Sequence, residues 1–559
     1  MRLHRRAVRL NHRLLHVMAL LLILLGLRAG WPAQAQTGAT LRIATPPLTA
    51  PDAPSPIPDP VTLRLDDRAG RDLIENLFVG LFRYDPAAGA AVPVLAREWT
   101  VSPDGLTWTF TLRDDIAWVS YDASSGEVDQ LRPVVAADVV AALRRACHPL
   151  RPTPESTAIF AIRGCYTALQ ANPLVLPNDQ IEALVGAEAP DSTTLVLHLA
   201  FPVSYLPSLL TAPEFRPVPR EFTAFSAAWT RMASSGPYVL KEASEEGLSL
   251  IRNPFWPESL PGNLNAVTLR YTEDPAASFA AGDTDFARLP ATPANAALPD
   301  VVATRGWRVT MLGFSSERAW INDSNVRRAL AWSIDRAAVL NDDPLRAPVN
   351  VLTHPAAIDG GAIEQAGLGY EPEAARAALA EAGYPNCAGV PEIMGLGVPP
   401  GLEGLAEQLV AGWSQTLGCH PALFEIVTVR APQLQNIARN LIDQEYNDRI
   451  HLWLATYTPE HVDVHGGAAD AFHCGVGYFY SGMDATTCAA LDTLIDLATQ
   501  SALPDRPDVY RQLEAWLFGA VGSYPAVPLW AEREITGIRS GLKAQALGPA
   551  WWGDWTLAE

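Results

Sequence analysis

The sequence predicts an α/β protein built from two or three packed units with mixed sheets. Its 559 residues are more than one hydrophobic core usually holds. Candidate strands and helices follow one another without the strict alternation that produces a purely parallel sheet. The 47 prolines and 39 glycines imply many turns and loops, and they argue against a long helical bundle or coiled coil.

The elements expected first along the chain are a strand, a helix, a hairpin and a second helix. A short apolar strand over residues 40–44 precedes a proline-rich segment, 46–60, that cannot be helical. Apolar residues at helical spacing predict a helix over 69–82. Two alternating runs around a Pro-Asp-Gly turn predict a hairpin over 99–112, and a helix follows over 135–147.

The rest of the chain continues this mixture. Strands are expected over 193–199, 236–241, 248–252, 266–271 and 450–455. Helices are expected over 326–340, 372–382, 489–500 and 508–521. The first of these helices follows the capping cluster Asn322-Asp323-Ser324, and the second has a proline in its first turn and Gly383 as its stop.

Residues 1–35 have the layout of a secretory signal peptide. Residues 2–13 are rich in arginine, residues 17–27 are apolar, and Ala33-Gln34-Ala35 is a small-x-small cleavage site. The apolar run is shorter than the roughly 20 residues that cross a bilayer, although an uncleaved anchor is the alternative. We expect export to the periplasmic or extracellular face of the cytoplasmic membrane. No cysteine lies near the cleavage site, so a lipid-modified N-terminus is not expected.

Export to an oxidising compartment favours disulfide bonds between the six cysteines. The cysteines form three pairs of neighbours along the chain, and proximity favours the pairings Cys147–Cys165, Cys387–Cys419 and Cys474–Cys488. Six cysteines allow 15 connectivities, so other pairings stay open. A metal site is less favoured because the sequence has no C-x-x-C pair.

The net charge of −20 argues against binding to nucleic acid. An acidic surface repels the phosphates of nucleic acids and of anionic lipid headgroups. The partners expected are therefore neither nucleic acids nor anionic membranes.

Short blocks of this sequence match motifs of one known protein family and follow one another in the same order as in that family. They lie at 59–60, 75–86, 93–114, 136–145, 235–256, 281–285, 326–336, 374–384 and 525–530. The most specific block is Val326-Arg327-Arg328-Ala329-Leu330 followed by Ile334-Asp335-Arg336. In this order the chain resembles the family 5 solute-binding proteins of ABC transporters, which is the dipeptide, oligopeptide and nickel group.

The resemblance implies a two-lobed, periplasmic-binding-protein-like fold of class II, cluster C type. Two lobes with mixed sheets are joined by a hinge, and a small extra domain is added. Lobe I is expected over 36–64, 190–290 and 520–559, the extra domain over 65–189, and lobe II over 291–519.

The resemblance also implies the function of an extracytoplasmic solute-binding component of an ABC importer. Such a protein captures a peptide-like or other small solute in the cleft between its lobes and presents it to the permease subunits. We expect a monomer without a cofactor and without enzymatic activity.

The family pattern Trp-x-Ala-Asp-Tyr at the ligand cleft reads Trp453-Leu454-Ala455-Thr456-Tyr457 here. In peptide-binding relatives the aspartate pairs with the α-ammonium of the ligand. Thr456 replaces it, and because a buried ammonium without a carboxylate is costly, a peptide with a free amine is disfavoured. Trp453 and Tyr457 are expected to form flat walls of the cleft, with core packing as the alternative.

Three further cleft residues are expected near the end of the strand that contains Met311. Relatives usually have an asparagine where Ser315 stands, so Ser315 and the preceding Phe314 are candidate ligand contacts. Trp320 lies close to them in sequence and is a third candidate.

A polar cluster follows Tyr457. His461, Asp463 and His465 alternate along the chain, and imidazole suits zinc, nickel or copper. Their spacing fits no tight metal template. The favoured interpretation is a solvated loop beside Cys474 and Cys488, and a metal site is the alternative.

Motifs of known enzyme classes are absent from the sequence. It contains no G-x-S-x-G, H-E-x-x-H, Walker A or G-x-G-x-x-G pattern. Carboxylates are plentiful, so an exported hydrolase is the main alternative to a binding protein. A sensor or chaperone that does not take part in transport is the third interpretation.

Overall fold

The computed structural model describes most of the chain. The described residues are 38–558 without 50–54, 64–66, 151–157, 221–232, 316–319, 359–362, 440–448, 475–476, 480–482, 484, 502–504, 521 and 523–524. The expected signal peptide, residues 1–35, lies outside them. Within the described chain, none of the helices combines the length and the apolar character that a membrane crossing requires.

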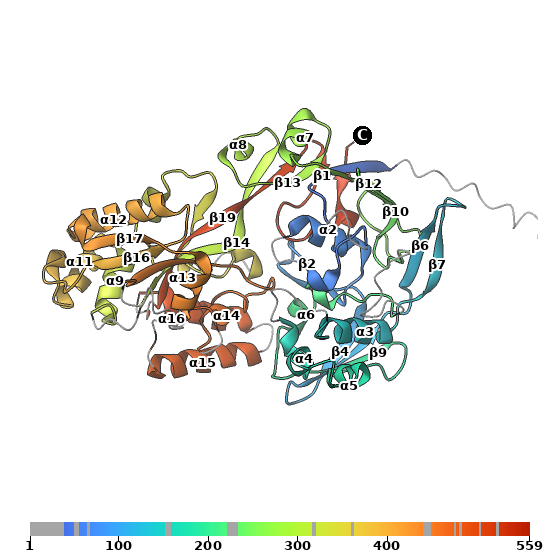
Figure 1. Ribbon diagram of the computed structural model, residues 1–559, viewed down its shortest axis with the longest axis horizontal. Coiled ribbons are helices and arrows are strands. Elements are labelled where there is room, and N and C mark those ends of the chain that lie inside the picture. Colours follow the sequence, from blue (N-terminus) through green and yellow to red (C-terminus); the bar gives the residue numbers. More distant parts are fainter. Residues whose placement is uncertain are drawn as a thin grey trace, which may run out of the picture.

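One 11-stranded mixed sheet runs through both halves of the molecule (Figure 1). We use lobe I for the half that contains β1 (Ala39–Thr45) and β12 (Leu264–Tyr271). Lobe II is the half that contains β16 (Met394–Val398) and β17 (Phe424–Thr428). The strand order is β10-β11-β12-β1-β13-β19-β14-β18-β16-β17, with β15 beside β19.

Two long antiparallel strands connect the lobes. β14 (Val301–Phe314) pairs with β19 (Ala526–Ile538) from Val301 opposite Gly537 to Gly313 opposite Ala526. At one end β19 pairs with β13 in lobe I, and at the other end β14 pairs with β18 in lobe II. These two strands therefore occupy the position of a hinge, as a two-lobed fold requires.

Lobe I and the segment predicted as an extra domain share one hydrophobic core. Phe110 and Leu197 from the predicted extra segment belong to the same buried cluster as Leu41 and Leu269. The strands and helices of this half are β2 (Phe82–Asp85), β3 (Ala90–Pro93), β4 (Ala96–Val101), β5 (Thr107–Leu112), β6 (Ala117–Asp122), β7 (Glu127–Pro133), β8 (Ala187–Glu188), β9 (Thr194–His198), β10 (Tyr238–Ser244), β11 (Gly247–Arg252), β13 (Phe286–Leu289), β20 (Leu542–Lys543), β21 (Thr556–Leu557), α2 (Arg68–Leu77), α3 (Ala136–Ala146), α4 (Cys165–Leu169), α5 (Asn178–Glu182), α6 (Leu206–Leu209) and α7 (Pro275–Ala281). The exact boundaries between the expected domains stay a prediction.

Lobe II packs helices against its part of the sheet and has two buried clusters of its own. Its remaining elements are β15 (Arg346–Pro348), β18 (Leu452–Tyr457), α9 (Ser324–Trp332), α10 (Arg336–Leu340), α11 (Pro372–Glu381), α12 (Glu403–Leu417), α13 (Ala431–Ala438), α14 (Ala468–Phe472), α15 (Ala485–Gln500) and α16 (Arg506–Phe518), while α8 (Pro293–Ala296) leads into β14.

The helix expected over 326–340 is two helices, so the prediction of one continuous helix is wrong. α9 ends at Trp332, and α10 begins at Arg336. Asp335 has extended backbone angles, and its carboxylate accepts a hydrogen bond of 3.1 Å from the Ala338 N–H. Asp335 is therefore the N-cap of a new helix rather than an interior residue of one continuous helix.

The helix expected over 69–82 ends early, at Leu77. Phe78 is extended, and Phe82 already belongs to β2. Gly236 lies against the end of this helix, where a Cβ atom would come within 2.4 Å of the Asn76 carbonyl oxygen. Glycine is required there because the two backbones touch.

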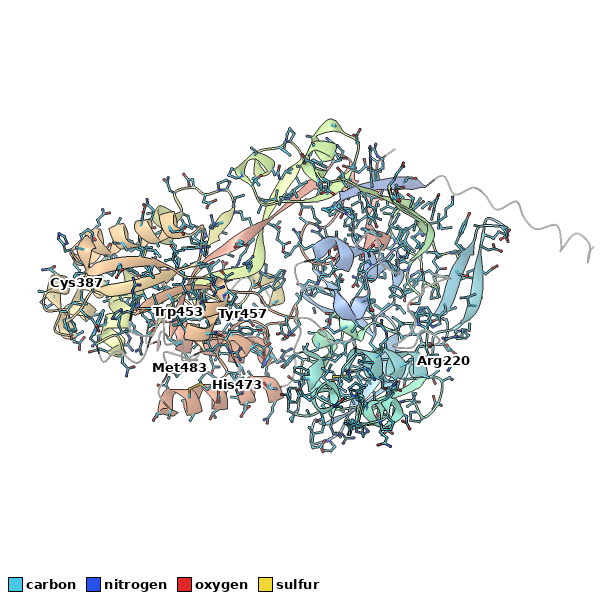
Figure 2. All side chains as sticks on the ribbon, viewed as in Figure 1. Arg220, Cys387, Trp453, Tyr457, His473 and Met483 are labelled. Carbon is cyan, nitrogen blue, oxygen red and sulfur yellow. A yellow bond between two sulfur atoms is a disulfide. The ribbon has the colours of Figure 1, made fainter. Side chains whose placement is uncertain are left out.

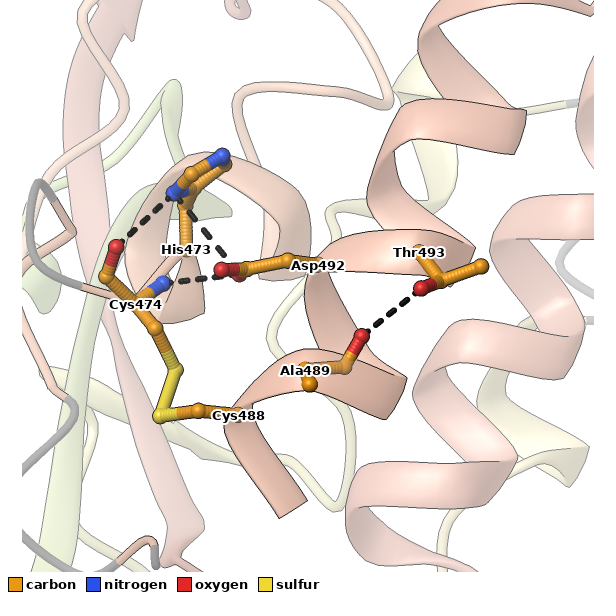
Figure 3. Close-up of a disulfide and its surroundings, with 6 residues drawn as sticks. All are labelled: His473, Cys474, Cys488, Ala489, Asp492 and Thr493. Atoms are coloured by element: carbon orange, nitrogen blue, oxygen red, sulfur yellow. Dashed lines mark hydrogen bonds and ion pairs between the residues drawn. A yellow bond between two sulfur atoms is a disulfide. The ribbon is translucent and has the colours of Figure 1, made fainter. Parts of the chain in front are cut away.

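The structure contains the three disulfides that join neighbouring cysteines. The Cα–Cα distances are 4.9 Å for Cys147–Cys165, 4.9 Å for Cys387–Cys419 and 5.7 Å for Cys474–Cys488. Figure 3 shows the third of these bonds, beside which the Asp492 carboxylate accepts a hydrogen bond of 2.9 Å from the Cys474 N–H. This contact ties the segment after α14 to α15.

Candidate functional site

A cavity of about 440 Å³ lies between the lobes, next to the paired strands β14 and β19. Its lobe I wall comes from α2 and residues 548–549, and its lobe II wall is the loop 458–462 that follows β18. The connecting strands contribute residues 306–308 and 532–535. A space of about 30 Å³ adjoins the cavity and shares residues of both walls. We call the two spaces together the cleft, whose main volume is typical of small-molecule sites.

A bulge in β14 shapes the centre of the cleft. Arg305 pairs with Arg533 and Val309 pairs with Ala531, so three residues of β14 lie opposite one residue of β19. A bulge of this kind redirects side chains out of the ladder. It places Trp307 on the cleft wall. Gly306 fits the bulge because a Cβ atom there would lie 2.8 Å from a carbonyl oxygen of β19.

Trp307 is held between aromatic side chains of both lobes. Its ring lies 4.1 Å from the His354 ring of lobe II and 6.4 Å from the Tyr84 ring of lobe I, measured between centroids. Tyr84 also donates a hydrogen bond of 3.0 Å to the Ala356 carbonyl, which joins β2 to lobe II.

His354 is a neutral imidazole with a defined tautomer. Burial, followed by the nearby charge of Arg305, lowers the pKa of His354 to about 4. Its Nε2–H donates to the Arg305 carbonyl at 3.1 Å, and its Nδ1 accepts from the Ala356 N–H at 3.1 Å. The surface against which Trp307 packs is therefore fixed and uncharged near neutral pH.

Ion pairs line the rest of the cleft. Arg68 of α2 and Glu534 of β19 lie 2.7 Å apart, while Arg308 and Glu532 lie 3.6 Å apart at the more exposed rim. Burial, together with the charge of Arg288, lowers the pKa of Arg68 to about 10. These pairs give the cleft both signs of charge beside its aromatic wall, which suits a polar solute.

Two of the β18 residues that were expected to contact ligand, Trp453 and Tyr457, are buried in lobe II (Figure 2), and the third, Thr456, is partly buried. Trp453 stacks on Phe479 at 5.6 Å and belongs to a core cluster. Tyr457 donates a hydrogen bond of 2.7 Å to the Gly466 carbonyl, and burial raises its pKa well above the usual value. The Thr456 hydroxyl lies 3.1 Å from the Thr310 hydroxyl of β14.

These three residues do not line the cavity, but the segment that starts directly after Tyr457 does. Trp453 and Tyr457 pack in the core and support this loop. Their direct contact with a solute, and that of Thr456, stays a prediction.

Phe314, Ser315 and Trp320 lie at the far end of β14, away from the cavity lining. Phe314 is fully buried, and Trp320 donates from Nε1 to a Glu392 carboxylate oxygen at 3.3 Å. Ser315 donates its N–H to the His451 carbonyl at 2.9 Å. A role of these three residues in ligand binding also stays a prediction.

His461, Asp463 and His465 are buried, so the interpretation as a solvated loop is wrong. Asp463 forms an ion pair of 2.5 Å with Arg506. Burial is the largest single effect and raises the pKa of Asp463, but the charge and hydrogen bonding of Arg506, together with His461 and the His465 N–H, outweigh it and lower the pKa below its usual value. The Tyr510 hydroxyl and His465 Nδ1 share a hydrogen bond of 2.6 Å.

This cluster engages protein groups instead of forming a set of metal ligands. Across the residues that the structure describes, three or more His, Cys, Asp or Glu side chains nowhere gather in a way that could hold a metal ion. The carboxylate of Asp463 is already neutralised by the guanidinium of Arg506.

The cluster forms a second contact between the lobes, which we call the Tyr205 contact. The Tyr205 ring of lobe I stacks on the His465 ring at 4.0 Å and lies 5.6 Å from the Arg506 guanidinium. Ser208 of α6 donates a hydrogen bond of 2.8 Å to Asp463. The contact consists of Tyr205, Ser208, Asp463, His465, Arg506 and Tyr510.

The sequence motifs pointed to β18, which directly precedes the lining loop, and to His461, which lines the cavity, but they missed most of the residues that line the cleft. The missed lining residues are Arg68, Arg71, Trp307, Arg308, Glu460 and Glu532. Arginine and glutamate are common on any surface, so their position in the sequence carries no signal. Trp307 is exposed to the cleft only because β14 bulges against a strand more than 200 residues away.

A cleft between two lobes that share hinge strands defines the class of two-lobed solute-binding proteins. Residues 90–419 match the family model described as bacterial extracellular solute-binding proteins, family 5 Middle. The chain belongs to this family.

Curated relatives include peptide-binding proteins. The periplasmic oligopeptide-binding protein OppA of Haemophilus influenzae is 29% identical over 331 residues, which is 55% of this chain and 58% of the relative. The periplasmic murein peptide-binding protein MppA of Escherichia coli is 28% identical over 277 residues, or 47% of this chain and 48% of the relative. The matches thus span about half the length of these relatives.

Solved structures agree with the fold over nearly the whole chain. The unliganded open form of the murein tripeptide-binding protein MppA has a TM-score of 0.74 and 20% identity, covering 93% of this chain and 98% of that one. HbpA2 from Haemophilus parasuis has a TM-score of 0.69 and 17% identity, with coverage of 93% and 100%.

Proposed function

We propose that this chain is the exported solute-binding component of an ABC importer and that it captures a small, peptide-like solute in the cleft. The observation that carries the proposal is the cleft itself, which lies beside the two hinge strands and has one wall from each lobe. A solute that touches both walls stabilises the arrangement in which the lobes enclose it.

The lining supports a peptide-like solute. It offers an aromatic face at Trp307, ion pairs at the rim, and apolar residues such as Leu289 and Val462. Peptide groups carry both donors and acceptors, and their side chains carry apolar surface, so this mixture complements them. The relatives named as peptide-binding proteins support the same proposal.

The proposed mechanism is binding with a shift in lobe populations, without a change in any covalent bond. Binding favours the arrangement in which both walls touch the solute, and release favours separation of the walls. A membrane permease that recognises the solute-bound arrangement completes the transport step. The proposal makes the protein a monomeric partner of that permease and gives it no cofactor.

Mass spectrometry of the mature protein under native conditions tests the proposal. We expect a small solute to co-purify, to raise the melting temperature when added back to stripped protein, and to be recovered unchanged after incubation. Recovery of a cleaved product would favour the exported hydrolase instead. Absence of any retained or stabilising solute would contradict both proposals.

A further inference from the structure

We propose that Trp307 orients the solute by donating a hydrogen bond from its indole Nε1–H to a carbonyl or carboxylate oxygen of the solute. The indole ring would at the same time cover an apolar part of the same molecule. This inference rests on the proposed function and adds the chemical group that the solute presents at the hinge.

The indole nitrogen of Trp307 is an unpaired donor at the cleft. The Trp307 Nε1 atom is buried and has no hydrogen-bond partner among the residues that the structure describes, and Trp307 lines the cavity. A buried donor without an acceptor is unfavourable, so a site with such a donor favours an occupant that supplies the acceptor. Indole nitrogen can only donate, which makes the required group an acceptor.

Trp307 differs in position from other tryptophans with an unpaired Nε1. Trp453, Trp530 and Trp555 have the same unpaired atom, but each is 1% exposed and belongs to a hydrophobic core cluster. Trp307 is only partly buried and faces the cavity between the lobes. A solute in the cavity can therefore contact the Trp307 ring, whereas the other three rings lie within a core. The proposed bond also requires the Nε1 atom, which is buried in the described arrangement, to become exposed when the lobes move apart.

The side chain of Trp307 is also held rigidly by its neighbours. Trp307 packs on His354, whose ring is fixed by two hydrogen bonds, and on Tyr84, whose hydroxyl is bonded to Ala356. A donor that is already held in place loses little conformational entropy when it binds, so its hydrogen bond contributes to affinity. Because Tyr84 and His354 belong to different lobes, a solute at Trp307 lies where the two lobes meet.

A positively charged side chain follows the indole in the sequence. Arg308 follows Trp307 in the bulge, its side chain is 57% exposed, and its distance of 3.6 Å to Glu532 is long for an ion pair. A loosely paired guanidinium at the rim can turn toward a solute oxygen. The neighbouring donor and cation together favour an oxygen acceptor over an amine at this position.

The test compares Trp307→Phe with a matched control, Trp99→Phe. Phenylalanine keeps a ring against His354 but removes the donor. Trp99 is 36% exposed on β4 and is not among the cleft residues. The probes are N-acetyl-trialanine and its C-terminal amide, titrated by calorimetry into the mature, stripped protein, with unfolding curves recorded for each variant.

We expect wild type and Trp99→Phe to bind at least one of the two probes, with the same affinity for that probe. Trp307→Phe should bind the same probe roughly 2- to 10-fold more weakly, with unchanged stability. This is the ratio expected for the loss of one neutral hydrogen bond.

The two probes also identify the acceptor group. Binding of the acid alone identifies a carboxylate as the acceptor, and binding of both probes identifies a carbonyl.

Equal affinity of Trp307→Phe and wild type would overturn the inference and leave the proposed function standing. Failure of wild type to bind either probe would overturn both the inference and a peptide-like solute.

Discussion

At the residue scale, His354 shows how burial sets the state of a side chain behind the cleft. Its pKa of about 4 lies well below the usual 6.5, because burial and Arg305 disfavour the charged ring. The ring is therefore neutral throughout the range in which an exposed histidine titrates. This keeps the packing surface of Trp307 constant as the pH changes.

Acidification should therefore destabilise the protein partly through His354. In the unfolded state His354 takes up a proton near pH 6.5, whereas in the folded state it does so only near pH 4. The contribution of His354 to the free energy of unfolding is therefore fully present above pH 6.5 and falls as the pH drops toward 4. We expect a loss of about 2–3 kcal/mol between pH 7 and pH 4.5 from this group. Urea unfolding of wild type and His354→Gln at both pH values measures it.

The variant should lose less stability on acidification than wild type, by about that amount. His420 provides the control, since it caps a short turn beside α12 and its Nδ1 accepts from the Ala422 N–H at 3.2 Å on the exposed surface. His420→Gln, which removes an exposed histidine, is measured in the same way for comparison. An identical pH dependence for wild type and His354→Gln would contradict the assignment.

Residue-level chemistry was only partly predictable from the sequence. The three disulfides follow from proximity along the chain, since short loops close easily. The burial of His461 and Asp463 could not be predicted in this way, because the residues that cover them, Tyr205 and Arg506, come from distant segments. Local sequence cannot indicate which surface another segment will cover.

At the element scale, the bulge in β14 is the feature that turns a hinge strand into a wall of the cleft. Pairing of residues 301–305 and 309–313 with β19 holds the strand on both sides of the bulge. Strands and helices such as β1, β18 and α11 were predictable because their patterns are local. The bulge was not, since it depends on register with a partner strand far along the chain.

Substitution of Gly306 tests the bulge. In Gly306→Ala the new Cβ would lie 2.8 Å from the Glu532 carbonyl, so the backbone must shift. We expect a loss of about 1–3 kcal/mol in the free energy of unfolding, together with weaker solute binding. The control is Gly412→Ala in α12, where a Cβ meets nothing within 4 Å.

The control should be stabilised by up to about 1 kcal/mol, because alanine favours a helix over glycine. Urea unfolding of both variants gives the comparison. Equal stability of Gly306→Ala and wild type would show that the bulge does not depend on this close approach.

At the scale of the whole molecule, the lobes are joined by the hinge strands and also touch at the Tyr205 contact and at Tyr84. The sequence predicted two lobes and a cleft through the order of its family blocks. It could not predict the Tyr205 contact, which brings together residues 205–208, 463–465 and 506–510. Contacts between lobes depend on the final arrangement of both.

Loss of one hydrogen bond across the Tyr205 contact should loosen it measurably. Ser208→Ala removes the donor to Asp463, a loss of about 1 kcal/mol. The His465 N–H, which donates to Asp463 at 2.8 Å, should then exchange with solvent roughly 5-fold faster. Ser124→Ala, on an exposed turn, is the control and should leave this exchange unchanged. Unchanged exchange in Ser208→Ala would contradict a role for this bond in holding the lobes.

A crystal structure of the mature protein with the solute that co-purifies tests the central claim most directly. We expect an intact small molecule between Trp307 and the loop 458–462, in contact with both lobes. A molecule bound elsewhere, or a cleft that stays empty in protein shown by mass spectrometry to carry solute, would contradict it.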